Sequence, residues 1–148
     1  MQKIDQDKIV ILDFGSQYTQ LIARRIREIG VLSEIVSCEI TPKELSKLNP
    51  RGIIFSGGPE SVNSKFKPTF NSKILEINQP ILGICYGMQL LANQYEGKVD
   101  LSAKREFGHS ELAINKNILF KGIKGKKTKI DVWMSHGDKV VKLPKQFK

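Results

Sequence analysis

The chain has 148 residues, 40% of them hydrophobic and 26% charged, which is an ordinary composition for one globular domain. No apolar run reaches the roughly 18 residues that a membrane span needs, and the first residues lack the pattern of a signal peptide. Two cysteines are too few for a disulfide framework or a four-ligand zinc site. We therefore expect a cytoplasmic protein with no membrane partner and no metal.

The net charge of +9 permits binding to nucleic acid but does not establish it. The densest basic segment, 121–129, contains no aromatic side chain that could stack on a base. We expect this segment to be a solvated loop and expect no nucleic-acid partner.

Short apolar runs alternate with helical stretches along the chain, which predicts an α/β fold with a mostly parallel sheet. In chain order, we expect strands over 9–13, 31–37, 52–56 and 80–84, and helices over 17–29, from Thr41 onwards, over 73–78 and over 87–95. Two or three further strands are expected around 98–101, 110–114 and 129–134.

Two of these helices show an apolar stripe that predicts their buried faces. The predicted buried residues are Tyr18, Leu21, Ile22, Ile26 and Ile29 in the first helix, and Met88, Leu91, Ala92 and Tyr95 in the helix over 87–95.

The segment 83–87, Gly-Ile-Cys-Tyr-Gly, joins a predicted strand to a predicted helix and has the form of a nucleophile elbow. Glycines two residues before and after Cys85 remove the Cβ atoms that would collide in so tight a turn. The helix N-terminus that follows contributes partial positive charge, which favours the reactive thiolate. The pattern therefore predicts Cys85 as a nucleophile, whereas Cys38 has no such surroundings and is expected to be structural.

An oxyanion hole is predicted beside this elbow. The backbone N–H of Tyr86, directly after the nucleophile, is one expected donor. A second donor has to come from a neighbouring loop, and the segment 57–59, Gly-Gly-Pro, follows the preceding strand. Because ligands bind at the carboxyl edge of open parallel sheets, we expect these loops to meet there.

These residues resemble a known family. The segments 83–89 and 56–59 look like the nucleophile motif and the oxyanion loop of class I glutamine amidotransferases. Longer strings at 11–25, 56–61, 105–108 and 131–138 are similar to the amidotransferase domain of the GMP synthase family. The resemblance implies a three-layer, flavodoxin-like fold in which residues 1–148 form one glutaminase domain, with its C-terminal part and the ATP-pyrophosphatase and dimerisation domains absent.

The resemblance also implies a reaction and roles for particular residues. Glutamine would be hydrolysed through a thioester on Cys85, with the N–H groups of Gly58 and Tyr86 holding the oxyanion. Gln89 would contact the amino-acid end of the substrate. The remaining predicted substrate-binding residues are Ser135, Gly137 and Asp138.

The implied partners are glutamine and a synthetase domain that uses ATP and Mg²⁺ to aminate XMP to GMP, in an enzyme expected to be a homodimer. No cofactor is expected in these 148 residues.

The general base of the family lies in a His-Pro-Glu motif, which does not occur in this sequence. The two histidines, His109 and His136, are expected to be structural or to line the site. An alternative function is therefore binding of glutamine, or of a synthetase partner, without turnover. A nucleotide-binding alternative would use the loop 15–19, but that loop has one glycine and no basic side chain for a phosphate.

Overall fold

The computed structural model describes residues 7–114, 118–121 and 129–147. Residues 122–128 of the predicted basic loop lie outside this part of the chain. The chain divides into two compact units, Met1–Asp100 with Lys139–Lys148 and Leu101–Asp138, and we call their described parts the core unit and the hairpin unit.

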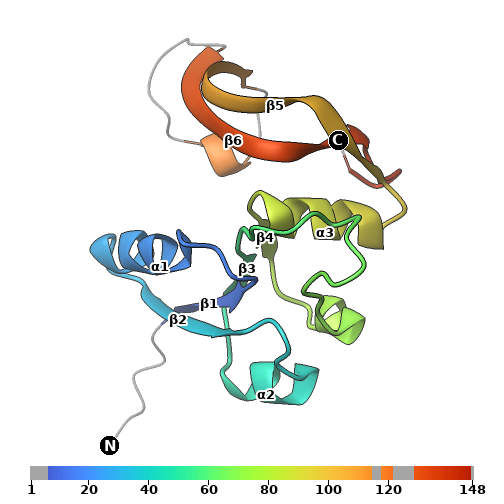
Figure 1. Cartoon of the computed structure of the whole chain (residues 1–148). Coiled ribbons are helices and arrows are strands. Elements are labelled where there is room, and N and C mark those ends of the chain that lie inside the picture. Colours follow the sequence, from blue (N-terminus) through green and yellow to red (C-terminus); the bar gives the residue numbers. More distant parts are fainter. Residues whose placement is uncertain (1–6, 115–117, 122–128, 148) are drawn as a thin grey trace, which may run out of the picture. The chain divides into compact units, whose positions relative to one another are not determined.

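The elements of the chain appear in Figure 1. In order, they are β1 (Lys8–Asp13), α1 (Thr19–Glu28), β2 (Leu32–Ser37), α2 (Pro42–Lys47), β3 (Gly52–Phe55), the 3-10 helix η1 (Ser72–Glu76), β4 (Ile81–Gly83), α3 (Tyr86–Gln94), β5 (Lys98–Ala113), the 3-10 helix η2 (Ile118–Phe120) and β6 (Lys129–Lys142).

The core unit is built on a four-stranded sheet with the order β2-β1-β3-β4. All three strand pairs are parallel, and Leu12 of β1 lies between Val36 of β2 and Phe55 of β3. Helices α1 and α3 lie on one face of this sheet, and α2 and η1 lie on the other (Figure 1). The predicted three-layer α/β fold is confirmed, and its strand order is that of flavodoxin-like proteins.

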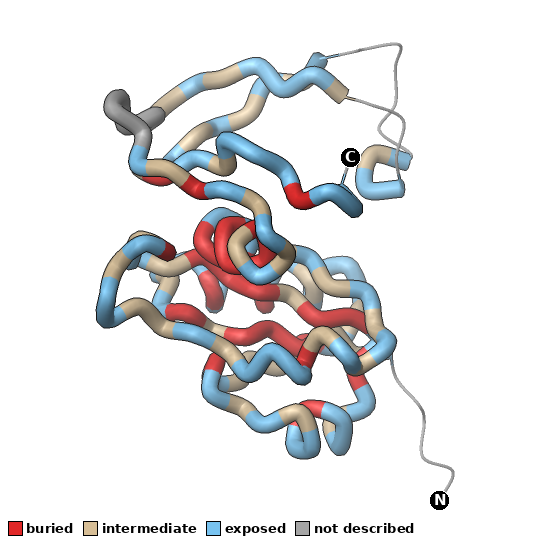
Figure 2. Tube along the Cα trace, turned by 90° about the vertical axis from the view of Figure 1, so that its right-hand side faces the viewer, coloured by how far each residue is buried: buried red, intermediate tan, exposed pale blue. Residues whose placement is uncertain are grey.

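The hydrophobic core lies along the two central strands and α3, where the buried residues gather in Figure 2. Val10, Ile11 and Leu12 of β1 have no exposed surface. Since successive residues of a strand point to opposite faces, three buried residues in a row require cover on both faces. The helices on each side of the sheet supply that cover, so the continuous apolar run in the sequence follows from the layered architecture.

The predicted buried stripe of α1 is wrong for several residues. Tyr18, Leu21 and Ile29 are exposed by 54%, 45% and 77%, and the buried positions of α1 are Thr19 and Ala23. Small residues let the helix approach the sheet closely and bond to it. The Ala23 carbonyl accepts a buried hydrogen bond of 2.9 Å from the Ser33 hydroxyl on β2.

The predicted face of α3 is wrong at Met88, which is 45% exposed. The helix begins at Tyr86, and its buried residues occupy most of its circumference, so apolar periodicity alone does not identify the outward side. These buried residues are Tyr86, Gly87, Gln89, Leu90, Leu91 and Ala92.

Strands β5 and β6 form a separate two-stranded sheet. The strands predicted over 98–101 and 110–114 are parts of one continuous strand, β5, and β6 extends beyond the predicted end at Met134. Polar residues between these segments interrupt the hydrophobic pattern, but they do not prevent the backbone from pairing. Within the described residues, no helix is long and apolar enough to cross a membrane.

Candidate active site

Cys85 occupies the sharp turn between β4 and α3. Its backbone angles are φ 51° and ψ −111°, outside the regions that residues with a side chain prefer. The thiol-bearing residue is exposed, whereas Tyr86 directly after it is 1% exposed. The predicted strand–turn–helix arrangement is therefore present, and its strain falls on the residue that was expected to react.

The two glycines that flank Cys85 are required by close packing. A Cβ atom at Gly83 would lie 2.6 Å from the backbone nitrogen of Met88, and one at Gly87 would collide with the carbonyl of Phe55. In both cases the obstacle is backbone, which cannot rotate away as a side chain can. The Gly-x-Cys-x-Gly spacing thus reflects a turn pressed against the end of β3.

Backbone hydrogen bonds fasten the turn to β3. The N–H of Ile84 donates to the Phe55 carbonyl at 2.9 Å, and the N–H of Gly87 donates to the Ser56 carbonyl at 3.0 Å. Among the described residues, no group accepts a hydrogen bond from the N–H of Tyr86. This is one of the free donors that begin every α-helix, and it lies directly after Cys85.

The Gly57–Gly58 segment packs against this turn. A Cβ atom at Gly57 would lie 3.6 Å from the Cβ of Cys85, and one at Gly58 would lie 2.8 Å from the carbonyl oxygen of Phe14. Larger residues would not fit without displacing the backbone of Phe14. The structure therefore places the predicted oxyanion loop beside the predicted nucleophile, at the carboxyl edge of the sheet.

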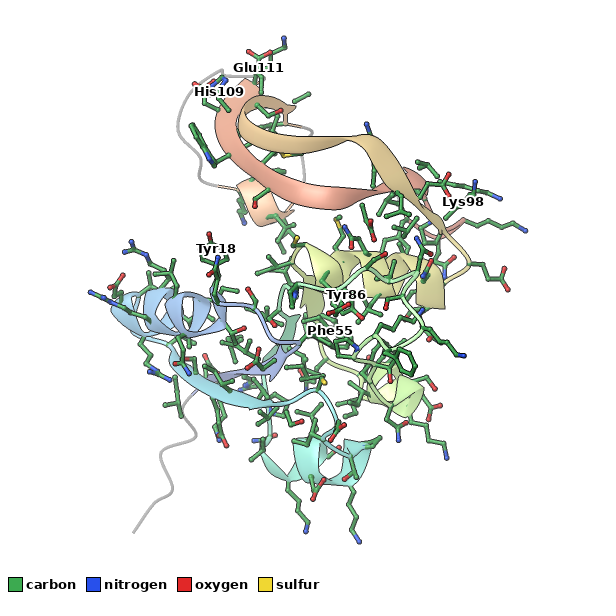
Figure 3. The ribbon with its side chains drawn as sticks, viewed as in Figure 1. Tyr18, Phe55, Tyr86, Lys98, His109 and Glu111 are labelled. Atoms are coloured by element: carbon green, nitrogen blue, oxygen red, sulfur yellow. The ribbon has the colours of Figure 1, made fainter. Side chains whose placement is uncertain are left out.

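Aromatic packing anchors Tyr86 in the core. Its ring centroid lies 5.6 Å from that of Phe14, which in turn lies 5.6 Å from Phe55. Figure 3 shows Tyr86 and Phe55 close together where α3 begins. The Tyr86 hydroxyl donates to the Pro68 carbonyl at 2.5 Å. Burial, with smaller contributions from Cys38 and Glu60, raises the pKa of Tyr86 to about 12.

The two cysteines differ in their surroundings. Cys38 is 8% exposed, and burial, followed by the nearby Glu39 carboxylate, raises the pKa of its thiol. Cys85 is exposed. Because the thiolate is the reactive form, this contrast favours reaction at Cys85. Gln89 follows one turn into α3 and is 4% exposed, and its N–H donates to the Cys85 carbonyl at 3.1 Å.

No individual role was predicted from the sequence for three polar residues at the carboxyl edge of the sheet, although Ser56 lies in the predicted loop 56–59. Ser56, fully buried, lies between β3 and the Gly57–Gly58 segment. The Ser16 hydroxyl faces Gly57, and Asp13 accepts hydrogen bonds from the Gly15 N–H and from Thr19. Each lies at or just beyond the carboxyl end of an apolar strand, and that position was the signal that could have identified them.

The second predicted substrate-binding segment lies on β6 in the hairpin unit. Ser135 is exposed, Gly137 is half-buried and Asp138 is 7% exposed. His136 belongs to the same strand. These residues therefore belong to a different compact unit from Cys85.

His109 pairs within the hairpin unit. Its Nε2 lies 2.9 Å from Asp131 Oδ1, and both side chains are well exposed. Across the described residues, no three or more His, Cys, Asp or Glu side chains gather in a way that could hold a metal ion.

Residues 10–148 match the model of the family "Glutamine amidotransferase class-I". The chain belongs to the class I glutamine amidotransferases. It is 49% identical to a GMP synthase from Photorhabdus laumondii and 50% identical to one from Pediococcus pentosaceus, over 97% and 96% of its own length. It spans 29% and 27% of those two proteins, so the amidotransferase match covers less than a third of each.

A solved structure from Thermoplasma acidophilum, assigned to a GMP synthase subunit, is similar over 99% of this chain and 72% of that one. The TM-score is 0.81 at 30% sequence identity. The amidotransferase fold expected from the motifs is thus found in a relative of known structure.

Proposed function

We propose that the chain is the glutaminase portion of a GMP synthase and that it releases ammonia from glutamine through a thioester on Cys85. The observation that carries the proposal is the exposed Cys85 on a strained turn, packed against Gly57 at the carboxyl edge of the sheet. An activated nucleophile and backbone donors for the oxyanion are parts that acyl transfer uses, and a helix N-terminus and a glycine loop can supply them.

In the proposed reaction, the Cys85 thiolate forms a bond to the side-chain carbonyl carbon of glutamine. The carbonyl oxygen takes up the negative charge, and the N–H groups of Gly58 and Tyr86 stabilise it. Collapse of this intermediate breaks the C–N bond, and the nitrogen leaves as ammonia after it takes up a proton. Water then cleaves the thioester, which yields glutamate and regenerates the thiol.

The remaining predicted residues would recognise the substrate. Gln89 would contact the amino-acid end of glutamine from α3, and Ser135, Gly137 and Asp138 would contribute from β6. Neither assignment requires a cofactor or metal in these residues.

The ammonia would pass to a synthetase partner. We propose that residues 1–148 are part of one amidotransferase domain and that an ATP-pyrophosphatase domain, using ATP and Mg²⁺, consumes the ammonia to convert XMP to GMP in a homodimeric, cytoplasmic enzyme. The support is the near 50% identity to GMP synthases over almost the whole chain.

A second candidate function is a domain that binds glutamine, or a synthetase partner, with little or no turnover. The two candidates differ in the acid–base step, since loss of a positioned acid or base typically costs about 10²–10⁴-fold in rate.

Labelling with a chloro-ketone analogue of glutamine tests the nucleophile. We expect modification at Cys85 and none at Cys38 when the labelled chain is digested and analysed by mass spectrometry. Cys85→Ser should abolish labelling, and Cys38→Ser, the matched control, should retain it. Equal modification of both cysteines in the folded chain would refute the assignment.

Measurement of glutamate release separates the two candidate functions. Labelling at Cys85 with negligible glutamate release supports binding without turnover. Robust release that His136→Ala abolishes would make His136 the base.

A further inference from the structure

Ser56 makes four hydrogen bonds between the parts of the site. Its N–H donates to the Leu12 carbonyl of β1 at 3.1 Å, and its carbonyl accepts from the Gly87 N–H of α3 at 3.0 Å. Its hydroxyl accepts from the Phe14 N–H at 3.1 Å and donates to the Gly57 carbonyl at 3.0 Å. The residue is fully buried, so water does not compete for these bonds.

The bond to the Gly57 carbonyl bears on the oxyanion hole. The carbonyl of Gly57 and the N–H of Gly58 belong to one planar peptide unit, in which they point in opposite directions. A hydroxyl that holds the carbonyl on its own side therefore turns the Gly58 N–H to the opposite side. Among the described residues, no group accepts a hydrogen bond from that N–H, so it remains available.

Because glycines stand on both sides of it, the Gly57–Gly58 peptide unit has little intrinsic preference for one orientation over the other. Without Cβ atoms on either side, rotation of the unit by half a turn meets few steric barriers. Such a rotation would replace the N–H donor by a carbonyl oxygen, which repels a developing negative charge. A tether from a rigid neighbour is the simplest way to keep one orientation dominant.

We propose that Ser56 is a positioning residue that keeps the Gly57–Gly58 peptide in the orientation in which Gly58 N–H can stabilise an oxyanion. This rests on the proposed function, because the oxyanion arises in attack by Cys85. Ser56 contacts no reacting atom and acts through the peptide bond that follows it.

The test compares two reagents for Cys85 in the 148-residue chain. A chromogenic γ-thioester of glutamate acylates Cys85 by attack on its carbonyl carbon, which places negative charge on the carbonyl oxygen before the thiol leaves. Dithiodipyridine reacts with the thiolate by disulfide exchange and has no carbonyl. For Ser56→Ala, we expect the rate of acylation by the thioester to fall about 10- to 100-fold. The rate with dithiodipyridine should stay within about twofold, since it depends on the thiolate alone.

Ser33→Ala provides a matched control for lost stability. Ser33 is also a buried serine, and its hydroxyl donates to the Ala23 carbonyl at 2.9 Å, away from the Gly57–Gly58 segment. This variant should lose thermal stability to a similar extent and keep the ratio of the two rates unchanged. If Ser56→Ala fails to fold, the pair Ser56→Thr and Ser56→Val replaces it, because the two side chains have the same shape and only threonine retains the hydroxyl.

An unchanged ratio of rates in Ser56→Ala, or equal ratios in the threonine and valine variants, would overturn the role of Ser56. Failure of the wild-type chain to react at Cys85 would instead refute the proposed function, so the two failures are distinguishable.

Discussion

The core unit holds Cys85 and the hairpin unit holds the predicted substrate-binding residues of β6, and the two units are built differently. In the core unit, the strands β1 and β3 are covered on both faces and Cys85 lies on a turn fixed by backbone contacts. In the hairpin unit, Asp138 is the only residue that is buried among those whose burial is described. Large apolar side chains there, such as Trp133 at 78% exposed, lie open.

The difference in burial between the two units indicates which steps of the proposed reaction depend on tightly packed residues. Attack depends on a turn fixed by close backbone packing, and oxyanion stabilisation depends on a neighbouring loop that hydrogen bonds hold in place. Ser135, Gly137 and Asp138, which are predicted to bind substrate, lie on a strand of a unit in which few of the described residues are buried. Mutations should therefore have large effects in the first unit and small effects in the second.

Glycine substitutions provide the largest expected contrast. Gly87→Ala would place a methyl group into the Phe55 carbonyl, and we expect it to lower the free energy of unfolding by about 3 kcal/mol or more. Gly137→Ala on β6 has no atom within 4 Å of the added methyl, and we expect a change below about 1 kcal/mol. Urea denaturation followed by circular dichroism measures both. Similar losses of unfolding free energy in the two variants would contradict the expected difference in packing between the two units.

Alkaline pH provides the next contrast. The pKa of Tyr86 is about 12 in the folded chain, above its ordinary value of 10. The folded state therefore holds the proton more tightly than the unfolded state. The associated stability is fully present below pH 10 and is lost as pH rises towards 12.

Tyr86→Phe should abolish this part of the pH dependence, and it should also cost about 1 kcal/mol at neutral pH because the bond to Pro68 is lost. Unfolding midpoints measured from about pH 8 to 12 test both effects. A variant with the same alkaline profile as the wild type would contradict the role of Tyr86.

Surface ion pairs should show the smallest effects. The Lys129–Glu111 pair of the hairpin unit has side chains that are 61% and 52% exposed. We expect Lys129→Gln to change the free energy of unfolding by less than about 0.5 kcal/mol. The Lys8–Glu34 pair of the core unit is 21% and 42% exposed, and Lys8→Gln should cost up to about 1 kcal/mol. A larger loss of stability in Lys129→Gln than in Lys8→Gln would indicate that ion pairs stabilise the hairpin unit more than their exposure predicts.

Much of the core unit was predictable from local patterns. The apolar run at 9–13 predicted the strand β1. The helix expected from Thr41 onwards is α2, where the Thr41 hydroxyl accepts from the Glu44 N–H. The glycine spacing around Cys85 predicted the turn. Each of these signals lies within a few residues of the element that it specifies.

The errors arose where burial depends on distant segments. The apolar stripe of α1 satisfied the helical period, yet Leu21 and Ile29 are exposed. Ala23 faces the sheet because a small residue allows close approach to β2. Likewise, the hydrophobic pattern is interrupted after Leu101, and the sequence therefore did not predict one continuous β5. That strand forms by pairing with β6, which begins about thirty residues after the start of β5.

The sequence alone determined Cys85 as the candidate nucleophile, because the glycines that permit the turn are its immediate neighbours. The tertiary structure decided what surrounds it. Only the parallel pairing of β1, β3 and β4 brings Phe14, Gly57 and Cys85 to one edge. The role inferred for Ser56 depends on the same pairing, since its hydrogen bonds join segments that are far apart in the chain.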